Sequence, residues 1–199
     1  MAIVPLVACL ILGLASAGGF PKILWVYWEQ GEKAAPFFTK LAIKNKEYYA
    51  AKSGWEWHFL TATTLERYLD PKEINKIFSY AEDKLVQLKA DILRMMLLEK
   101  YGGMWMDANS VFAGDLSWVD NLRNDPRIYN KLQSEPEMLI GAYTDVSYEG
   151  KGNVTVLFDP ALNATVDVFP GYEDWFLLAK PNCSFLQAAL TSLPLVLQT

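Results

Sequence analysis

Apolar residues along this chain fall into short blocks whose spacing predicts alternating strands and helices. Residues 23–27 are continuously apolar, as expected of a buried strand. Residues 35–53 have the length of a helix that stops near Gly54, and residues 55–60 alternate with the two-residue period of a strand. Helices that alternate with buried strands favour an α/β fold with a mainly parallel sheet.

The strongest pattern lies in the middle of the chain, where a helix with Asp91 near its centre is apolar over most of its circumference. Such a helix is typically buried. At about 100° per residue, three polar side chains fall within roughly 60° of Asp91. They are Lys84, Gln87 and Arg94, while Lys89 lies on the far side. This narrow polar stripe predicts either an Asp91–Arg94 ion pair or the lining of a pocket.

A Tyr-Gly-Gly segment, residues 101–103, ends this helix, because glycine readily takes the left-handed conformation that stops helices. Residues 104–106 then form a short apolar strand of the kind that is covered on both faces. Asp107 and Asn109 follow directly. A bare Asp-x-Asn indicates only a turn, but ligands of open α/β sheets bind just beyond the carboxyl ends of strands. The position therefore predicts a ligand site.

The remaining elements are predicted with less detail. Short helices are expected on both sides of Pro71, at residues 64–68 and 72–78. Residues 121–137, rich in Asn, Asp, Pro and charge, are expected to form an irregular excursion. Further strands are expected at 138–143 and 155–158, and a final helix at 184–193.

Residues 89–109 resemble the core motif of sugar-nucleotide glycosyltransferases with a DXD-type site. They are most similar to capsular polysaccharide synthesis proteins and the α-1,6-mannosyltransferase-like family. Residues 21–28 resemble the first strand of these proteins, and residues 174–181 resemble a segment after the metal site. The resemblance implies a GT-A, Rossmann-like fold, a UDP- or GDP-sugar donor, a glycan acceptor and retaining transfer. It also implies a divalent metal, Mn²⁺ with Mg²⁺ as the alternative.

The resemblance also assigns roles to residues of this chain. The catalytic candidates are Asp91, Arg94 and Asp107, and the metal candidates are Asp107 and Asn109. The donor-binding candidates are Tyr27, Trp28, Gln30, Asp91, Arg94 and Asp107, and the sugar or acceptor candidates are Asp174 and Trp175. For Trp28, Asp174 and Trp175, packing within the protein is the competing interpretation.

The chain departs from the family pattern at Asn109, where the motif often carries a second acid. Asparagine ligates a hard cation through its carbonyl oxygen but brings no charge. We therefore expect a weaker metal site that depends on the diphosphate of the donor. No histidine follows Asp174 as a further ligand, and the apolar end of the chain suggests a truncated form. The rival interpretation is a degenerate glycan- or nucleotide-binding protein that keeps the fold without turnover.

The N-terminal residues indicate the secretory pathway. Residues 2–17 are almost wholly apolar and end in Ala-Ser-Ala, which fits a cleaved signal peptide. A membrane anchor is the alternative, although the segment spans only roughly 24 Å of a bilayer core of about 30 Å. Sequons at Asn153, Asn163 and Asn182 agree with a glycosylated protein of the Golgi lumen or the cell exterior. Residues 18–199 are then expected to form one domain.

Composition excludes several other classes of protein. With 52% hydrophobic residues and a net charge of −5, the chain has no basic footprint for nucleic acid. The long buried helix argues against an aromatic carbohydrate-binding β-domain. His58 and Cys183 lie away from the motif, and we expect both to be structural.

Overall fold

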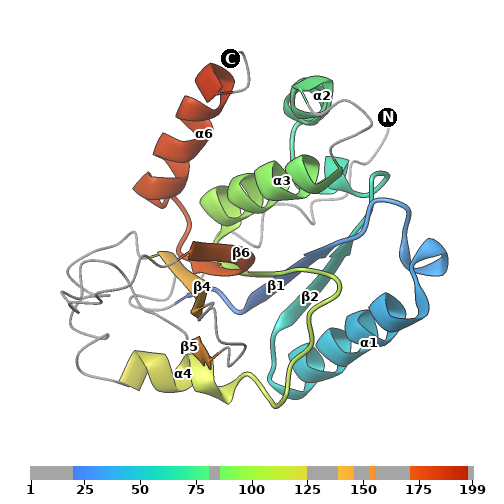
Figure 1. Ribbon diagram of the computed structural model, residues 1–199, viewed down its shortest axis with the longest axis vertical. Coiled ribbons are helices and arrows are strands. Elements are labelled where there is room, and N and C mark those ends of the chain that lie inside the picture. The colour runs from blue at the N-terminus through green and yellow to red at the C-terminus, as the bar shows by residue number, and fades with distance from the viewer. Residues whose placement is uncertain (1–19, 81–85, 125–138, 146–152, 156–170, 197–199) are drawn as a thin grey trace, which may run out of the picture.

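The computed structural model describes residues 20–80, 86–124, 139–145, 153–155 and 171–196, which build a six-stranded sheet with helices on both faces (Figure 1). The strands are β1 Ile23–Tyr27, β2 Glu56–Leu60, β3 Gly103–Met106, β4 Leu139–Asp145, β5 Asn153–Thr155 and β6 Gly171–Ala179. The helices are α1 Phe37–Lys52, α2 Pro71–Tyr80, α3 Val86–Tyr101, α4 Ser117–Asn124 and α6 Ser184–Val196. Single 3-10 turns lie at η2 Glu32–Ala34 and η3 Leu65–Arg67.

The strand order across the sheet is β2-β1-β3-β6-β4-β5. β1 pairs in parallel with β2 and β3, whereas β6 is antiparallel to both β3 and β4. β4 therefore points the same way as β1, β2 and β3. The expectation of a mainly parallel sheet is thus met in the direction of these four strands. The pairings beyond β3 are antiparallel. Residues 146–152 between β4 and β5 are too few for the crossover that parallel neighbours need.

The buried strands β1 and β3 fill both faces of the sheet. Leu24 and Val26 of β1 pack with residues of α1 and α4, whereas Trp25 and Tyr27 pack with residues of α2, α3 and α6. All four side chains are 6% exposed or less. Figure 1 shows these two helix groups on opposite sides of the sheet. The prediction of a strand covered on both faces is thus confirmed for β3, and β1, predicted as a buried strand, has the same arrangement.

The two glycines after α3 allow the turn from helix to strand. Gly102 and Gly103 have φ angles of 67° and 95°, a region that favours glycine. A Cβ on Gly103 would lie 2.5 Å from the carbonyl oxygen of Ile23, so this glycine lets β3 approach β1. The indole N–H of Trp25 donates to the Gly102 carbonyl at 2.9 Å, which ties the same turn to β1.

The predicted elements agree with the structure in most of the described chain. α1, β2, α3, β4 and α6 lie within a few residues of their expected positions, and Gly54 after α1 has a φ angle of 69°. The expected short helices are the turn η3 and the helix α2, which begins at Pro71, where proline fits the first helical position. The strand expected at 155–158 overlaps β5 only at Thr155, and its other residues lie outside the described chain.

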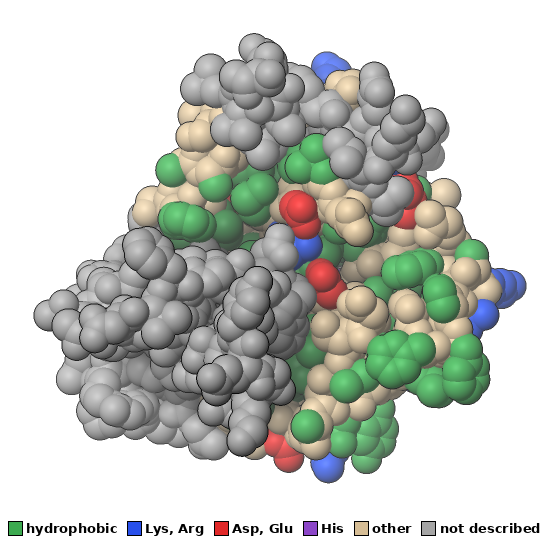
Figure 2. Space-filling model, viewed as in Figure 1, with side chains coloured by type: hydrophobic (Ala, Val, Ile, Leu, Met, Phe, Trp, Pro, Cys, Tyr) green, Lys and Arg blue, Asp and Glu red, His purple; other side chains and the backbone are tan. Residues whose placement is uncertain are grey.

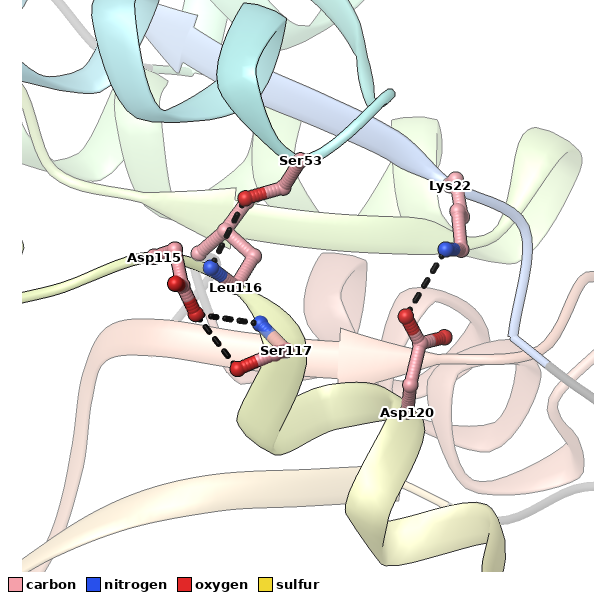
Figure 3. A network of polar contacts seen from close by, with 6 residues as sticks. All are labelled: Lys22, Ser53, Asp115, Leu116, Ser117 and Asp120. Atoms are coloured by element: carbon pink, nitrogen blue, oxygen red, sulfur yellow. Dashed lines mark hydrogen bonds and ion pairs between the residues drawn. The ribbon is translucent and has the colours of Figure 1, made fainter.

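The expected excursion over residues 121–137 was wrong at its start, because α4 continues to Asn124. Figure 3 shows the contacts that fix this helix. Asp115 accepts hydrogen bonds from the backbone N–H of Ser117, at 3.1 Å, and from the Ser117 hydroxyl. Asp120 pairs with Lys22 at 2.9 Å, and the hydroxyl of Ser53 accepts from the Leu116 N–H at 2.9 Å. Long-range partners therefore stabilise a polar segment that by itself favours turns.

Several expectations lie partly or wholly outside the described residues. Residues 1–17, residues 125–137 and the sequon at Asn163 are among them. Asn153 begins β5, and Asn182 is exposed between β6 and α6 with a φ angle of 61°. Among the helices of the described chain, we find none with the length and apolar character that a membrane crossing requires.

Candidate functional site

A cavity of about 690 Å³ lies where the ends of β1 and β3 face α3. Its lining residues are Tyr27, Trp28, Glu29, Gln30, Gln87, Ala90, Asp91, Arg94, Trp105, Asp107, Ala108 and Asn109. Figure 2 shows acidic and basic side chains gathered at the centre of this face. Because β1 and β3 are parallel, their carboxyl ends meet at one edge of the sheet, where α/β sheets bind ligands.

The structure brings together the residues that the family resemblance assigned to donor binding and to metal binding. Those residues are Tyr27, Trp28, Gln30, Asp91, Arg94, Asp107 and Asn109, and all of them line the cavity. The polar stripe of α3 faces it through Gln87, Asp91 and Arg94, whereas Lys84 lies outside the described residues. The roles of these residues stay predictions.

Arg94 links the two acids of the cavity. It is 3% exposed, and its guanidinium donates to Asp91 Oδ1 at 2.6 Å and lies 3.5 Å from Asp107 Oδ1. The guanidinium also lies over the ring of Trp105, 5.4 Å from its centroid. The side chains of Asp91 and Asp107 are 37% and 32% exposed. The ion pair and the pocket lining, which the sequence left as alternatives, are therefore both present.

Asp107 and Asn109, which follow β3, line this cavity. Asp107 Oδ1 accepts from the indole N–H of Trp105 at 2.8 Å, which orients the carboxylate. Asn109 is exposed, and both residues also border an adjoining cavity of about 400 Å³ with Ser110 and Val111.

The oxygen atoms of Asp107 and Asn109 fit a weakly held hard cation. Asp107 and Asn109 offer carboxylate and amide oxygens, the ligand type that such cations prefer. In the described chain, however, no three His, Cys, Asp or Glu side chains come together as a ligand set. A cation here would need further oxygens from a ligand.

Tyr27 and Trp28, at the end of β1, line the cavity and also carry two buried polar atoms. In the described chain, neither the buried Tyr27 hydroxyl nor the buried Trp28 indole N–H has a hydrogen-bond partner. Burial, with a smaller effect of Glu29, raises the pKa of Tyr27, so the phenol stays neutral and can donate. Buried polar groups are usually hydrogen-bonded, so these two donors are exceptions in the described part of the chain.

Sequence reasoning missed two lysines that support the site. Lys89 is 7% exposed, and its ammonium lies 3.0 Å from Glu29 Oε1 and over the ring of Phe78. Lys46 of α1 is fully buried, and its ammonium donates to the carbonyl of Ala108 at 2.9 Å. Burial lowers the pKa of Lys46 to about 7, against the attraction of Asp107. Both contacts span about sixty residues of sequence, so no local pattern indicates them.

The other singled-out residues lie elsewhere. Asp174 and Trp175 are in β6, and their side chains lie outside the described part of the chain. His58 is not among the residues that line the cavity; it stacks on Trp25 and hydrogen-bonds Tyr68 at 2.8 Å. Cys183 is 0% exposed, which agrees with the structural role expected for it.

Comparison with known proteins gives a family match and a similarity to an individual relative. Residues 18–159, more than half of the chain, match the family described as capsular polysaccharide synthesis protein. The chain is also 26% identical over 116 residues to the O-glycosyltransferase PaGT of Phomopsis amygdali. That alignment covers 53% of this chain and 28% of the relative, so the chain spans less than a third of that protein's length.

Proposed function

The chain belongs to the capsular polysaccharide synthesis protein family, and we propose that it is a glycosyltransferase that moves a sugar from a nucleotide diphosphate to a glycan or glycoconjugate. The observation that carries this proposal is the convergence of three elements on one cavity. The ends of β1 and β3 and the polar stripe of α3 all line it, with Arg94 between Asp91 and Asp107. The O-glycosyltransferase similarity supports the same class of reaction.

Arg94 is suited to the diphosphate of the donor. Its planar guanidinium matches phosphate oxygens in a forked geometry, and its burial strengthens the electrostatic attraction. Asp91 holds that guanidinium at 2.6 Å and is itself 37% exposed at the cavity, so it can also accept from sugar hydroxyls. Stabilising the charge that develops on the leaving diphosphate is the main catalytic task in this kind of transfer.

The base of the donor is proposed to lie against the end of β1. Tyr27 and Trp28 line this part of the cavity, and a base or ribose oxygen that reached the buried Tyr27 hydroxyl or Trp28 indole N–H would satisfy that donor. Gln30 lines the same side of the cavity and adds both a donor and an acceptor. These three residues are therefore the proposed determinants of nucleotide binding.

Asp107 and Asn109 are the proposed holders of a divalent cation, Mn²⁺ or Mg²⁺. Such a cation neutralises the diphosphate leaving group when it is bound. Asn109 is neutral, and Asp107 is already attracted by Arg94 at 3.5 Å. Asp107 and Asn109 alone therefore bind a cation weakly, and the diphosphate supplies the missing charge.

The acceptor side and the cellular location are supported by sequence alone. Asp174 and Trp175 are the proposed sugar or acceptor contacts, and retaining transfer is proposed on the family resemblance. Residues 2–17 and the three sequons support a protein of the secretory pathway, in the Golgi lumen or secreted. A shift in mass after endoglycosidase treatment of the protein expressed in eukaryotic cells tests that location.

A second candidate function is a glycan- or nucleotide-binding protein without turnover. Two observations favour it, the neutral Asn109 and the pairing of each cavity carboxylate with a protein cation. Glu29 pairs with Lys89, and both Asp91 and Asp107 lie within 4 Å of Arg94. A nucleotide-binding protein of this kind would share its ligand with the transferase, so binding and turnover must be measured separately.

The deciding experiment screens UDP- and GDP-sugars by calorimetry and thermal shift, with and without Mn²⁺, on protein that begins at Gly18. Mn²⁺-dependent binding of one donor, lost in Asp107→Ala, would support the transferase site. Hydrolysis or transfer from that donor would then separate the enzyme from the binding protein. A folded sample that binds none of the donors would contradict the proposal.

A further inference from the structure

Two neighbouring residues of α1 hold the loop that follows β3. Asn45 makes a reciprocal pair with the backbone of Phe112, donating to its carbonyl at 3.1 Å and accepting from its N–H at 2.7 Å. Lys46 donates to the carbonyls of Ala108 and Ser110. Four hydrogen bonds from one turn of helix therefore fasten both ends of the segment 108–112.

These contacts determine which groups of the loop face the cavity. The two carbonyls bound by Lys46 flank Asn109 in the chain and are directed toward α1. The side chains of Asp107 and Asn109, in contrast, line both cavities at this edge of the sheet. Lys46 is 0% exposed and lines neither cavity, so its ammonium acts on the loop rather than on a ligand.

Burying the Lys46 ammonium has a free-energy cost that a residue with only a stabilising role would not need. Removing an ion from water costs free energy before its partners compensate, and the hydrogen bonds that the ammonium donates offset part of that cost. Neighbouring α1 residues such as Ile43 fill the core without that cost. We therefore relate Lys46 to the conformation of the loop rather than to the free energy of unfolding.

We propose that Lys46 is a positioning residue that, together with Asn45, fixes the loop 107–112 so that Asp107 and Asn109 face a cation and the diphosphate bound to it. The ligand in this inference rests on the proposed function. The fastening of the loop does not, and can be measured without any ligand.

The test compares Lys46→Met with two matched controls on the same helix. Lys44→Met makes the same substitution at a side chain that is 58% exposed, and Ile43→Ala opens the core at a residue that is 1% exposed. Amide hydrogen exchange is followed in peptides covering residues 107–112, with α3 as the internal reference. UDP and GDP binding is measured with and without Mn²⁺. Asn45→Ala is the alternative variant if Lys46→Met does not fold.

We expect Lys46→Met to accelerate exchange in residues 107–112 by about tenfold or more, leaving α3 unchanged. The gain in nucleotide affinity on adding Mn²⁺ should also shrink by about tenfold, while both controls keep the wild-type gain. Loop exchange and Mn²⁺ gain matching those of Ile43→Ala would overturn the inference and leave Lys46 a purely stabilising residue.

The two proposals can fail separately. If the wild type binds neither nucleotide, the proposed function is contradicted and hydrogen exchange alone decides the positioning role. Faster exchange confined to residues 107–112 then supports the role of Lys46, and unchanged exchange overturns it.

Discussion

Replacing Arg94 with methionine separates its observed role in the ion pairs from its proposed role as a phosphate ligand. The guanidinium is 3% exposed and joins Asp91 of α3 to Asp107 after β3. Methionine keeps an unbranched side chain in the same space but removes the charge and all donors. Stability reports the loss of the ion pairs, and donor affinity reports the loss of a phosphate ligand.

The expected loss of stability is moderate. The short contact to Asp91 is a charge-assisted hydrogen bond worth about 1.5–3 kcal/mol, and the 3.5 Å contact to Asp107 adds less. Removing one partner of a fully buried pair costs about 3–5 kcal/mol. Here both carboxylates remain about one-third exposed and can be hydrated, and the desolvation of Arg94 is itself relieved. We therefore expect a loss of about 2 kcal/mol, a fall in Tm of roughly 4–8 °C for a domain of this size.

Arg94→Met should also weaken the binding of the nucleotide. A lost charge-assisted contact to the diphosphate should weaken binding of the Mn²⁺ complex of UDP or GDP by about 10- to 100-fold. Calorimetry at 20 °C measures this change well below the unfolding transition. Arg94→Lys, which keeps the charge but not the fork, should lie between wild type and Arg94→Met.

Leu93→Ala is the matched control, because Leu93 is 0% exposed and adjacent to Arg94 in α3, and does not line the cavity. It should lower stability by about 2–5 kcal/mol and leave donor affinity unchanged. Wild-type affinity in Arg94→Met would refute the phosphate role and reduce Arg94 to an ion-pair residue. An equal loss of affinity in Leu93→Ala would show that the binding assay reports general destabilisation.

Three further predictions test the metal, the glycine turn and the histidine. Asn109→Asp adds a charged ligand and should tighten Mn²⁺ binding to the free protein by about tenfold in a calorimetric titration; unchanged affinity would place the cation elsewhere. Gly103→Ala should cost several kcal/mol in urea unfolding, because its Cβ would lie 2.5 Å from the Ile23 carbonyl oxygen. Gly54→Ala should cost only about 1–2 kcal/mol, because its φ angle is also positive but its Cβ would meet nothing within 4 Å; equal losses would contradict the close approach of β3 to β1. Burial lowers the pKa of His58, against the opposing effect of Glu56. The unfolded chain therefore binds this proton more tightly, and stability should rise with pH toward the unfolded pKa of about 6.5. His58→Gln should have a flatter stability profile between pH 5 and 7.

The sequence predicted those parts of the fold that local patterns determine. Continuous apolar runs mark β1 and β3, which are covered on both faces. The apolar circumference of α3 and the glycines after it fix the helix, its end and the start of the next strand. Because β1 and β3 end at one edge, the residues after them and the stripe of α3 necessarily meet. The cavity residues were therefore predictable without any long-range contact.

The features that the sequence did not reveal depend on contacts between distant segments. α4 is stabilised by Lys22 and Ser53, which lie far from it in the chain. Lys46 and Lys89 appear in the sequence as ordinary lysines of two helices, yet both are buried against acceptors about sixty residues away. No spacing rule identifies a buried cation, because its burial is decided by what packs over it. The supporting residues of a site are for that reason harder to predict than its lining.

The ion pairs in the cavity do not argue against a ligand, because their exposure is unequal. Arg94 is buried while the two carboxylates that face it are about one-third exposed, so the acids can be rehydrated if the guanidinium turns to another anion. Asp91, at 2.6 Å, keeps Arg94 in place, whereas the 3.5 Å contact to Asp107 is the weaker of the two. A diphosphate that engages Arg94 therefore competes mainly with Asp107. That competition leaves the Asp107 carboxylate available to a cation, and binding of the nucleotide and of Mn²⁺ should reinforce each other even though Asn109 carries no charge.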